Sequence, residues 1–137
     1  MHKNPFFQFL FLLLLVIATL EFIGLDRLWL FVFWWFDLVL HFLGGVWVSG
    51  MALWFFFLSG YVQSPPRTVP KVAGVAAASF LIVGTGWEIF EFLAGAIFAT
   101  EVEYFFDTAT DMLIGLLGGV LIASFFVFHY AQKQKNI

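Results

Sequence analysis

Residues 72–98 read VAGVAAASFLIVGTGWEIFEFLAGAIF, an apolar stretch that is long enough to cross a bilayer and still contains Glu88 and Glu91. About 20 predominantly apolar residues suffice for a transmembrane helix. An ionised side chain at the centre of such a helix costs roughly 3 kcal/mol or more unless it is paired, hydrated or bound to a metal. The stretch therefore predicts a membrane-spanning helix that carries two carboxylates for a functional reason.

The composition of the whole chain extends this prediction to a membrane protein. Of its 137 residues, 63% are hydrophobic and only 11% are charged, with a mean hydropathy of +1.00. Soluble domains are much less apolar. The length admits about four spans and no separate soluble domain. We expect an all-α integral membrane protein, a four-transmembrane-helix bundle that forms one membrane domain over residues 1–137.

Four spans are expected at residues 6–22, 37–61, 72–98 and 105–130. The segment between the first two, Trp29–Phe36, contains three tryptophans, which are typical of the membrane–water interface, and we interpret it as a short interfacial or partly inserted segment. Prolines end any helix in the linker before the third span. A cleavable signal peptide is the alternative for the first span, but an Ala-x-Ala-like cleavage site is missing and a retained helix is favoured.

The basic residues predict the orientation of the bundle. Under the four-span interpretation, Arg27 lies on one side of the membrane and every other Lys or Arg lies on the opposite side. The residues of that larger group are Lys3, Arg67, Lys71, Lys133 and Lys135. By the positive-inside rule, both termini are cytoplasmic. The net charge of −3 gives no indication of nucleic-acid binding.

Three pairs of ionisable residues with the spacing of one helical turn lie at the same predicted depth. They are Asp37 with His41, Glu88 with Glu91, and Asp107 with Asp111. Each pair places two polar groups on one face of its helix. The predicted orientation puts all three pairs in the outer half of the membrane. Glycines follow the same faces and allow close helix approach, so we expect these faces to meet inside the bundle.

Structural roles are alternatives for some of these residues. His41 alone suits a hydrogen-bonded interior histidine, and Asp37 and Asp107 suit caps at helix starts. Glu88, Glu91 and Asp111 lie deeper within apolar segments and are harder to explain in this way. The shared depth of all three pairs favours one common site. Glu21 lies at a similar level, and its role stays open.

A divalent metal ion explains the whole set best. Five carboxylates and one imidazole suit Mg²⁺, Mn²⁺ or Ca²⁺, and the histidine also admits Zn²⁺ or iron. A bound cation would offset the repulsion between the carboxylates. All six residues are candidate ligands, and Glu88 or Glu91 is the candidate catalytic general base. The aromatic richness needs no haem or pigment, because Phe and Trp are ordinary residues of membrane surfaces.

The three motifs also carry a family resemblance. They are Asp37-x3-His41-Phe42, Glu88-x2-Glu91-Phe92 and Asp107-x3-Asp111-Met112. In this order they resemble the motifs of the YjdF-like (DUF2238) inner-membrane proteins and, more distantly, of the VanZ-like family. Gly115 stands where VanZ-like proteins usually have Asn. The resemblance implies a multi-pass protein of a bacterial or archaeal plasma (inner) membrane, without a defined activity.

Three functions are compatible with this pattern. A metal-dependent hydrolase would act on a membrane lipid or a lipid-linked headgroup at the outer leaflet. A cation or proton transport component would use the carboxylates as a relay, but the inner halves of the spans offer only serines as polar lining. A homo-oligomer or a membrane partner would then have to complete the pathway. The third possibility is a structural or assembly protein in which the cluster only holds helices together.

Overall fold

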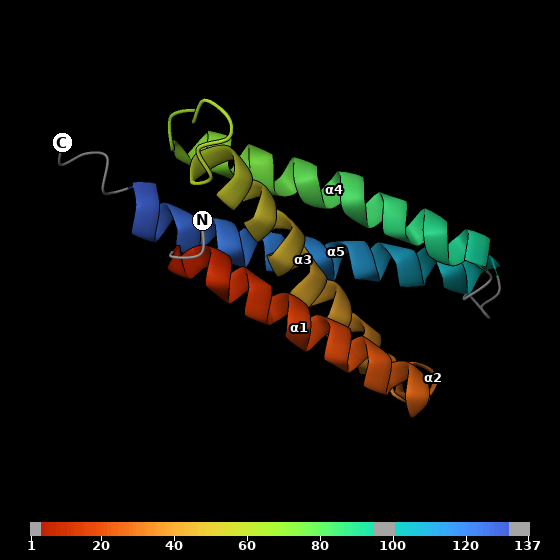
Figure 1. The fold of residues 1–137 in the computed structure, drawn as a ribbon. Coiled ribbons are helices and arrows are strands. Elements are labelled where there is room, and N and C mark those ends of the chain that lie inside the picture. The colour runs from red at the N-terminus through yellow and green to blue at the C-terminus, as the bar shows by residue number, and fades with distance from the viewer. Residues whose placement is uncertain (1–3, 95–100, 132–137) are drawn as a thin grey trace.

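The computed structural model describes residues 4–94 and 101–131, which are helical throughout apart from short connections (Figure 1). The helices are α1 (Pro5–Asp26), α2 (Trp29–Val32), α3 (Trp34–Phe57), α4 (Val69–Ala94) and α5 (Glu101–Phe126), and a π-helical turn, η1 (Val127–Ala131), continues α5. Four of these helices, all but α2 and η1, are long and apolar enough to cross a membrane. The predicted all-α bundle of four transmembrane helices is thus confirmed.

The first helix is longer than expected and ends in a tight turn. The Asn4 side chain accepts a hydrogen bond from the Phe6 N–H at 3.0 Å and caps the start of α1. The helix then continues to Asp26, past the predicted end at Phe22, because nothing in this stretch interrupts it. Leu28 has a φ of 58°, in the left-handed region, and this turns the chain into α2. The tryptophan-rich segment therefore divides into α2 and the first turn of α3.

The second and third long helices also differ slightly from their predicted bounds. Helix α3 spans Trp34–Phe57 instead of residues 37–61, and α4 begins at Val69 with a proline in its first turn, where the missing N–H is tolerated. The predicted end of the third span at residue 98 lies outside the described residues. The last turn of α3 is held by Arg67, whose Nη2 donates to the Phe57 carbonyl oxygen at 3.0 Å.

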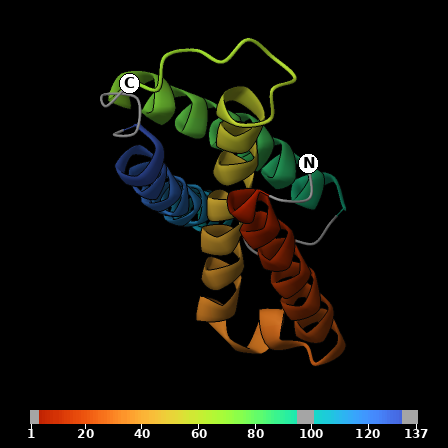
Figure 2. The same ribbon diagram turned by 60° about the vertical axis from the view of Figure 1, so that its left-hand side comes forward.

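Helix α3 is the centre of the bundle. It packs against α1, α4 and α5, and α5 packs also against α4 (Figures 1 and 2). The start of α1, the π-helical turn η1 and the linker from α3 to α4 lie at one end, which we call the terminal end (Figure 1). Helix α2, the end of α4 and the start of α5 lie at the opposite end, which we call the α2 end (Figure 1).

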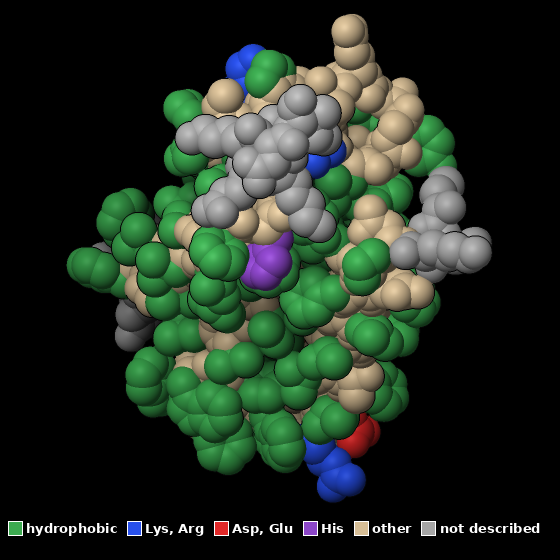
Figure 3. All heavy atoms as spheres, turned by 90° about the vertical axis from the view of Figure 1, so that its left-hand side faces the viewer, with side chains coloured by type: hydrophobic (Ala, Val, Ile, Leu, Met, Phe, Trp, Pro, Cys, Tyr) green, Lys and Arg blue, Asp and Glu red, His purple; other side chains and the backbone are tan. Residues whose placement is uncertain are grey.

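The apolar core fills the half of the bundle at the terminal end. Leu10, Leu53 and Phe126 are fully buried there, and Phe6 packs edge-on against Phe126. Hydrophobic side chains also cover most of the surface seen from this end, as expected for helices that face lipid (Figure 3). This half of the bundle is therefore largely apolar, both in its core and on the face that Figure 3 shows.

Helices α3 and α5 cross at glycines. A Cβ added to Gly45 would overlap the carbonyl oxygen of Gly115, and one added to Gly118 would overlap that of Phe42. Only residues without a side chain allow backbones to approach this closely. The crossing lies one helical turn from His41 on α3 and one turn from Asp111 on α5, so it brings these two residues together.

Candidate metal centre

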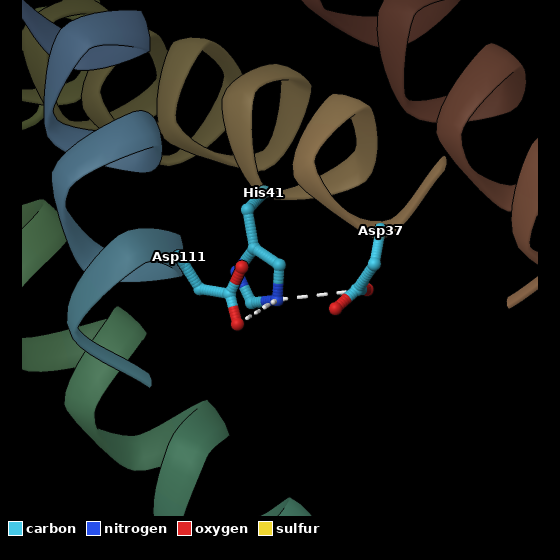
Figure 4. Close-up of side chains that lie close together, drawn as sticks. All are labelled: Asp37, His41 and Asp111. Atoms are coloured by element: carbon cyan, nitrogen blue, oxygen red, sulfur yellow. Dashed lines mark ion pairs between the residues drawn. The ribbon is translucent and has the colours of Figure 1, made fainter. Parts of the chain in front are cut away.

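Two helices supply the best-defined group of potential ligands. Helix α3 presents Asp37 and His41 on one face, and α5 presents Asp111 from the opposite side (Figure 4). His41 Nε2 lies 3.7 Å from Asp37 Oδ1 and 3.8 Å from Asp111 Oδ2. One ligand atom of each residue falls within 4.8 Å of the other two. The imidazole therefore lies between two carboxylates from different helices.

The Nδ1 side of the imidazole ring lies toward α4. His41 Nδ1 lies 4.0 Å from Glu88 Oε1, and Glu91 completes a second group of ligand atoms within 4.8 Å of one another. Thr108 of α5 donates a hydrogen bond to Glu88 Oε2 at 2.9 Å and ties the carboxylate to the third helix of the site. His41 thus belongs to both groups, with each ring nitrogen directed toward a different carboxylate.

Two carboxylates of the site are deeply buried and incompletely paired. Glu88 is 6% exposed and Asp111 is 2% exposed. Within the described residues, Glu88 Oε1 and Asp111 Oδ1 accept no hydrogen bond. A buried carboxylate oxygen without a donor is unfavourable, and buried charges are normally paired or bound to a metal. The donor set and its unmet oxygens fit a divalent cation.

Five of the six predicted residues converge in this way, and Asp107 does not. Its side chain is exposed, and its oxygens belong to neither group. Asp107 lies one turn closer to the α2 end than Asp111, beyond the crossing that holds α5 against α3. Asp107 shares its helix face with Asp111, but only Asp111 is buried and belongs to a ligand group.

Two further residues support the cluster and were not predicted as site residues. Thr108 holds Glu88, and the Trp87 indole N–H donates to the Glu91 carboxylate on its own helix. The position of Thr108, three residues before Asp111, is a usable signal, because residues three apart share a helix face. The contact between Trp87 and Glu91 follows from their spacing of one turn.

Glu21 lies close to the cluster without joining either ligand group. Glu21 lines the same cavity as Asp37 and His41, and the residue is half-buried. Within the described residues it makes no hydrogen bond or ion pair.

Comparison with protein families places this chain beside predicted membrane proteins. A family model described as a predicted membrane protein (DUF2238) matches residues 1–132. This match confirms the YjdF-like resemblance of the three motifs, whereas the VanZ-like resemblance stays a prediction. No curated protein and no solved structure was found to match the chain.

Proposed function

The chain belongs to the DUF2238 family of predicted membrane proteins, and from this starting point we propose that it binds a divalent metal ion at the α2 end and hydrolyses a lipid or lipid-linked headgroup there. The proposal rests on one observation: His41 Nε2 lies between Asp37 and Asp111, whose buried Oδ1 accepts no hydrogen bond within the described residues.

The spacing of these three residues suits one small cation. Ligands at about 2.0–2.2 Å from a Zn²⁺ or Mg²⁺ ion stand roughly 3–3.5 Å apart. The observed nitrogen–oxygen distances of 3.7 and 3.8 Å are slightly longer, so a small inward rotation of the carboxylates is enough to form the site. We therefore assign Asp37, His41 and Asp111 as the ligands and leave Asp107 out of the set.

The groups on α4 then have supporting roles. Glu88 faces His41 Nδ1 and would accept its N–H, which leaves Nε2 free for the metal. Glu91 is the candidate general base, since it lies beside His41 and Glu88 without being assigned as a ligand. When bound, a divalent ion lowers the pKa of bound water and polarises carbonyl or phosphoryl oxygens. Zn²⁺, Mg²⁺, Mn²⁺ and iron all suit this mixed set of ligands.

Two features of the structure argue against a transport protein and against a purely structural protein. A transport pathway through one copy would have to cross the core at the terminal end, where Leu53 and Phe126 are fully buried. A cluster that only held helices together would satisfy its buried oxygens with donors, and two of them lack one within the described residues. The hydrolase is therefore preferred over a transport or structural protein.

We further propose that the α2 end faces outward from the plasma membrane. Arg67 and Lys71 lie in and next to the linker at the terminal end, and three further lysines lie near the two termini. The positive-inside rule then places both termini in the cytoplasm. The site would meet lipids of the outer leaflet.

Elemental analysis of purified protein after dialysis tests the metal site. Wild type is expected to retain a divalent metal at near-stoichiometric level, and Asp111→Asn is expected to lose it. Asp107→Asn is the matched control on the same helix face and should retain the metal. Hydrolysis of outer-leaflet lipids by the reconstituted protein should be lost with the metal in Asp111→Asn. Metal-free wild type, or equal retention in both variants, would contradict the proposed site.

A further inference from the structure

An apolar groove leads from the lipid-facing surface to the candidate metal centre. It has a volume of about 320 Å³ and runs along α3 between α1 and α4. Leu14 and Ala18 of α1 and Val83 of α4 contribute to its apolar walls. Asp37 and His41 line the groove as well, so it is continuous with the proposed ligand set.

The groove has the size and position of a site for one lipid chain. Helices α1 and α4 both pack on α3 but not against each other, which leaves the groove open toward the bilayer between them. An α-helix of a partner protein is about 10–12 Å wide and would not fit in this volume, whereas small-ligand sites begin at about 300 Å³. Acyl chains are the apolar groups that surround the protein in a membrane. A single acyl chain is therefore the occupant that the groove fits.

The charge at one end of the groove selects the kind of headgroup. Glu21 and Asp37 both line it, and no Lys or Arg is found among the described residues of the lining. Asp37 has His41 as its partner, whereas Glu21 has no hydrogen bond or ion pair within the described residues. Trp47 and Trp87 also line the groove, and aromatic faces attract cations. This lining suits a cationic group and disfavours a headgroup that carries only negative charge.

We propose that the groove binds one acyl chain of an ethanolamine lipid and that the Glu21 carboxylate accepts hydrogen bonds from its ammonium group. The phosphate of such a headgroup would then face the cation held by Asp37, His41 and Asp111. This inference rests on the proposed function and names its substrate class. It also gives Glu21 a role that neither ligand group provides.

Lipid retention by the full-length protein tests the inference. The protein is incorporated into nanodiscs of equal parts phosphatidylethanolamine and phosphatidylglycerol, released into mild detergent, and analysed by native mass spectrometry for the lipid that stays bound. Wild type should retain phosphatidylethanolamine in preference to phosphatidylglycerol. Glu21→Gln keeps the size of the side chain and should lower that preference at least about tenfold, which is the lower end of the effect expected when a hydrogen bond to a charged group is lost.

A second variant tests the groove itself. Ala18→Trp places a large side chain on the groove wall and should abolish lipid retention, whereas Ala78→Trp, on an exposed part of α4 outside the groove, should leave retention unchanged. Equal retention of the two lipids by wild type, or an unchanged preference in Glu21→Gln, would overturn the inference. So would unchanged lipid retention in Ala18→Trp.

Metal content measured in the same preparations separates this inference from the proposed function. Neither Glu21→Gln nor Ala18→Trp changes a proposed ligand, so both should retain the metal. Metal binding without lipid preference would overturn the lipid inference alone. Selective retention of phosphatidylethanolamine by metal-free wild type would overturn the metal site and leave the lipid groove standing.

Discussion

Gly45 of α3 lies directly against the backbone of Gly115 of α5, so closely that a Cβ on Gly45 would overlap the Gly115 carbonyl oxygen. His41 precedes Gly45 by one helical turn, and Asp111 precedes Gly115 by one turn. The backbone contact therefore determines how near the imidazole and the carboxylate come. The distance of 3.8 Å between His41 Nε2 and Asp111 Oδ2 therefore depends on Gly45 and Gly115, which have no functional side chains.

Gly45→Ala is expected to destabilise the bundle and weaken metal binding together. The added methyl group must push α3 and α5 apart, and overpacking of this kind costs about 1–3 kcal/mol. Thermal unfolding in detergent and metal content measure the two effects. Gly44→Ala is the control, because an added Cβ there meets nothing within 4 Å. Equal behaviour of the two variants would show that the glycine contact is unimportant.

Thr108→Val is expected to weaken metal binding with little loss of stability. The substitution removes the hydrogen bond to Glu88 at 2.9 Å and so releases the carboxylate that faces His41 Nδ1. Loss of such an outer partner typically lowers metal affinity about 10–100-fold. Thr110→Val is the matched control, since that hydroxyl donates to the Phe106 carbonyl oxygen of its own helix. Competition with a fluorescent chelator measures the affinities, and similar values for both variants would rule out the role of Thr108.

Ser49→Ala is expected to lower stability without affecting the site. The Ser49 hydroxyl is fully buried and donates to the Ala76 carbonyl oxygen of α4 at 3.0 Å. Hydrogen bonds between membrane helices contribute about 0.6 kcal/mol on average. Ser124→Ala is the control, because that hydroxyl bonds within its own helix and is exposed. Titration with a denaturing detergent compares the two, and an equal effect would contradict a special contribution of Ser49.

Single cysteines can test the orientation of the bundle, because the natural chain has none. Asp26→Cys at the α2 end should react with a membrane-impermeant maleimide in intact cells. Gln63→Cys in the linker at the terminal end should react only after the membrane is permeabilised. The reverse pattern would place the site on the cytoplasmic side and contradict an outer-leaflet substrate.

The number and type of the helices could be predicted from the sequence, because hydropathy and length alone decide whether a helix can span a bilayer. Their ends could be predicted less well. The first helix continues past Phe22 because the helical backbone extends beyond the most hydrophobic part of the segment. The turn at Leu28 has a left-handed backbone conformation, which is usually indicated in a sequence by glycine, and position 28 is not a glycine. These features depend on local backbone geometry and not on apolar character.

The composition of the site was only partly accessible from sequence. Helical spacing places Asp107 and Asp111 on one face and does not distinguish them, but in the structure only Asp111 is buried and belongs to a ligand group. This difference depends on where α3 and α5 cross. Glycine positions suggest a close approach without specifying the partner: Gly44 meets nothing, whereas Gly45 meets Gly115. The hydrogen bond of Thr108 to Glu88 joins α5 to α4, and the spacing of residues along one helix cannot predict a contact between two helices.

The glycine crossing also separates two halves of the bundle. On one side of it α3 and α5 carry buried core residues such as Leu53 and Phe126, and on the other side they carry His41 and Asp111. A change in the bulk of core residues such as Leu53 or Phe126 would therefore alter the gap between His41 and Asp111 from a distance. The proposed metal site would then depend on side chains of the core that do not contact it.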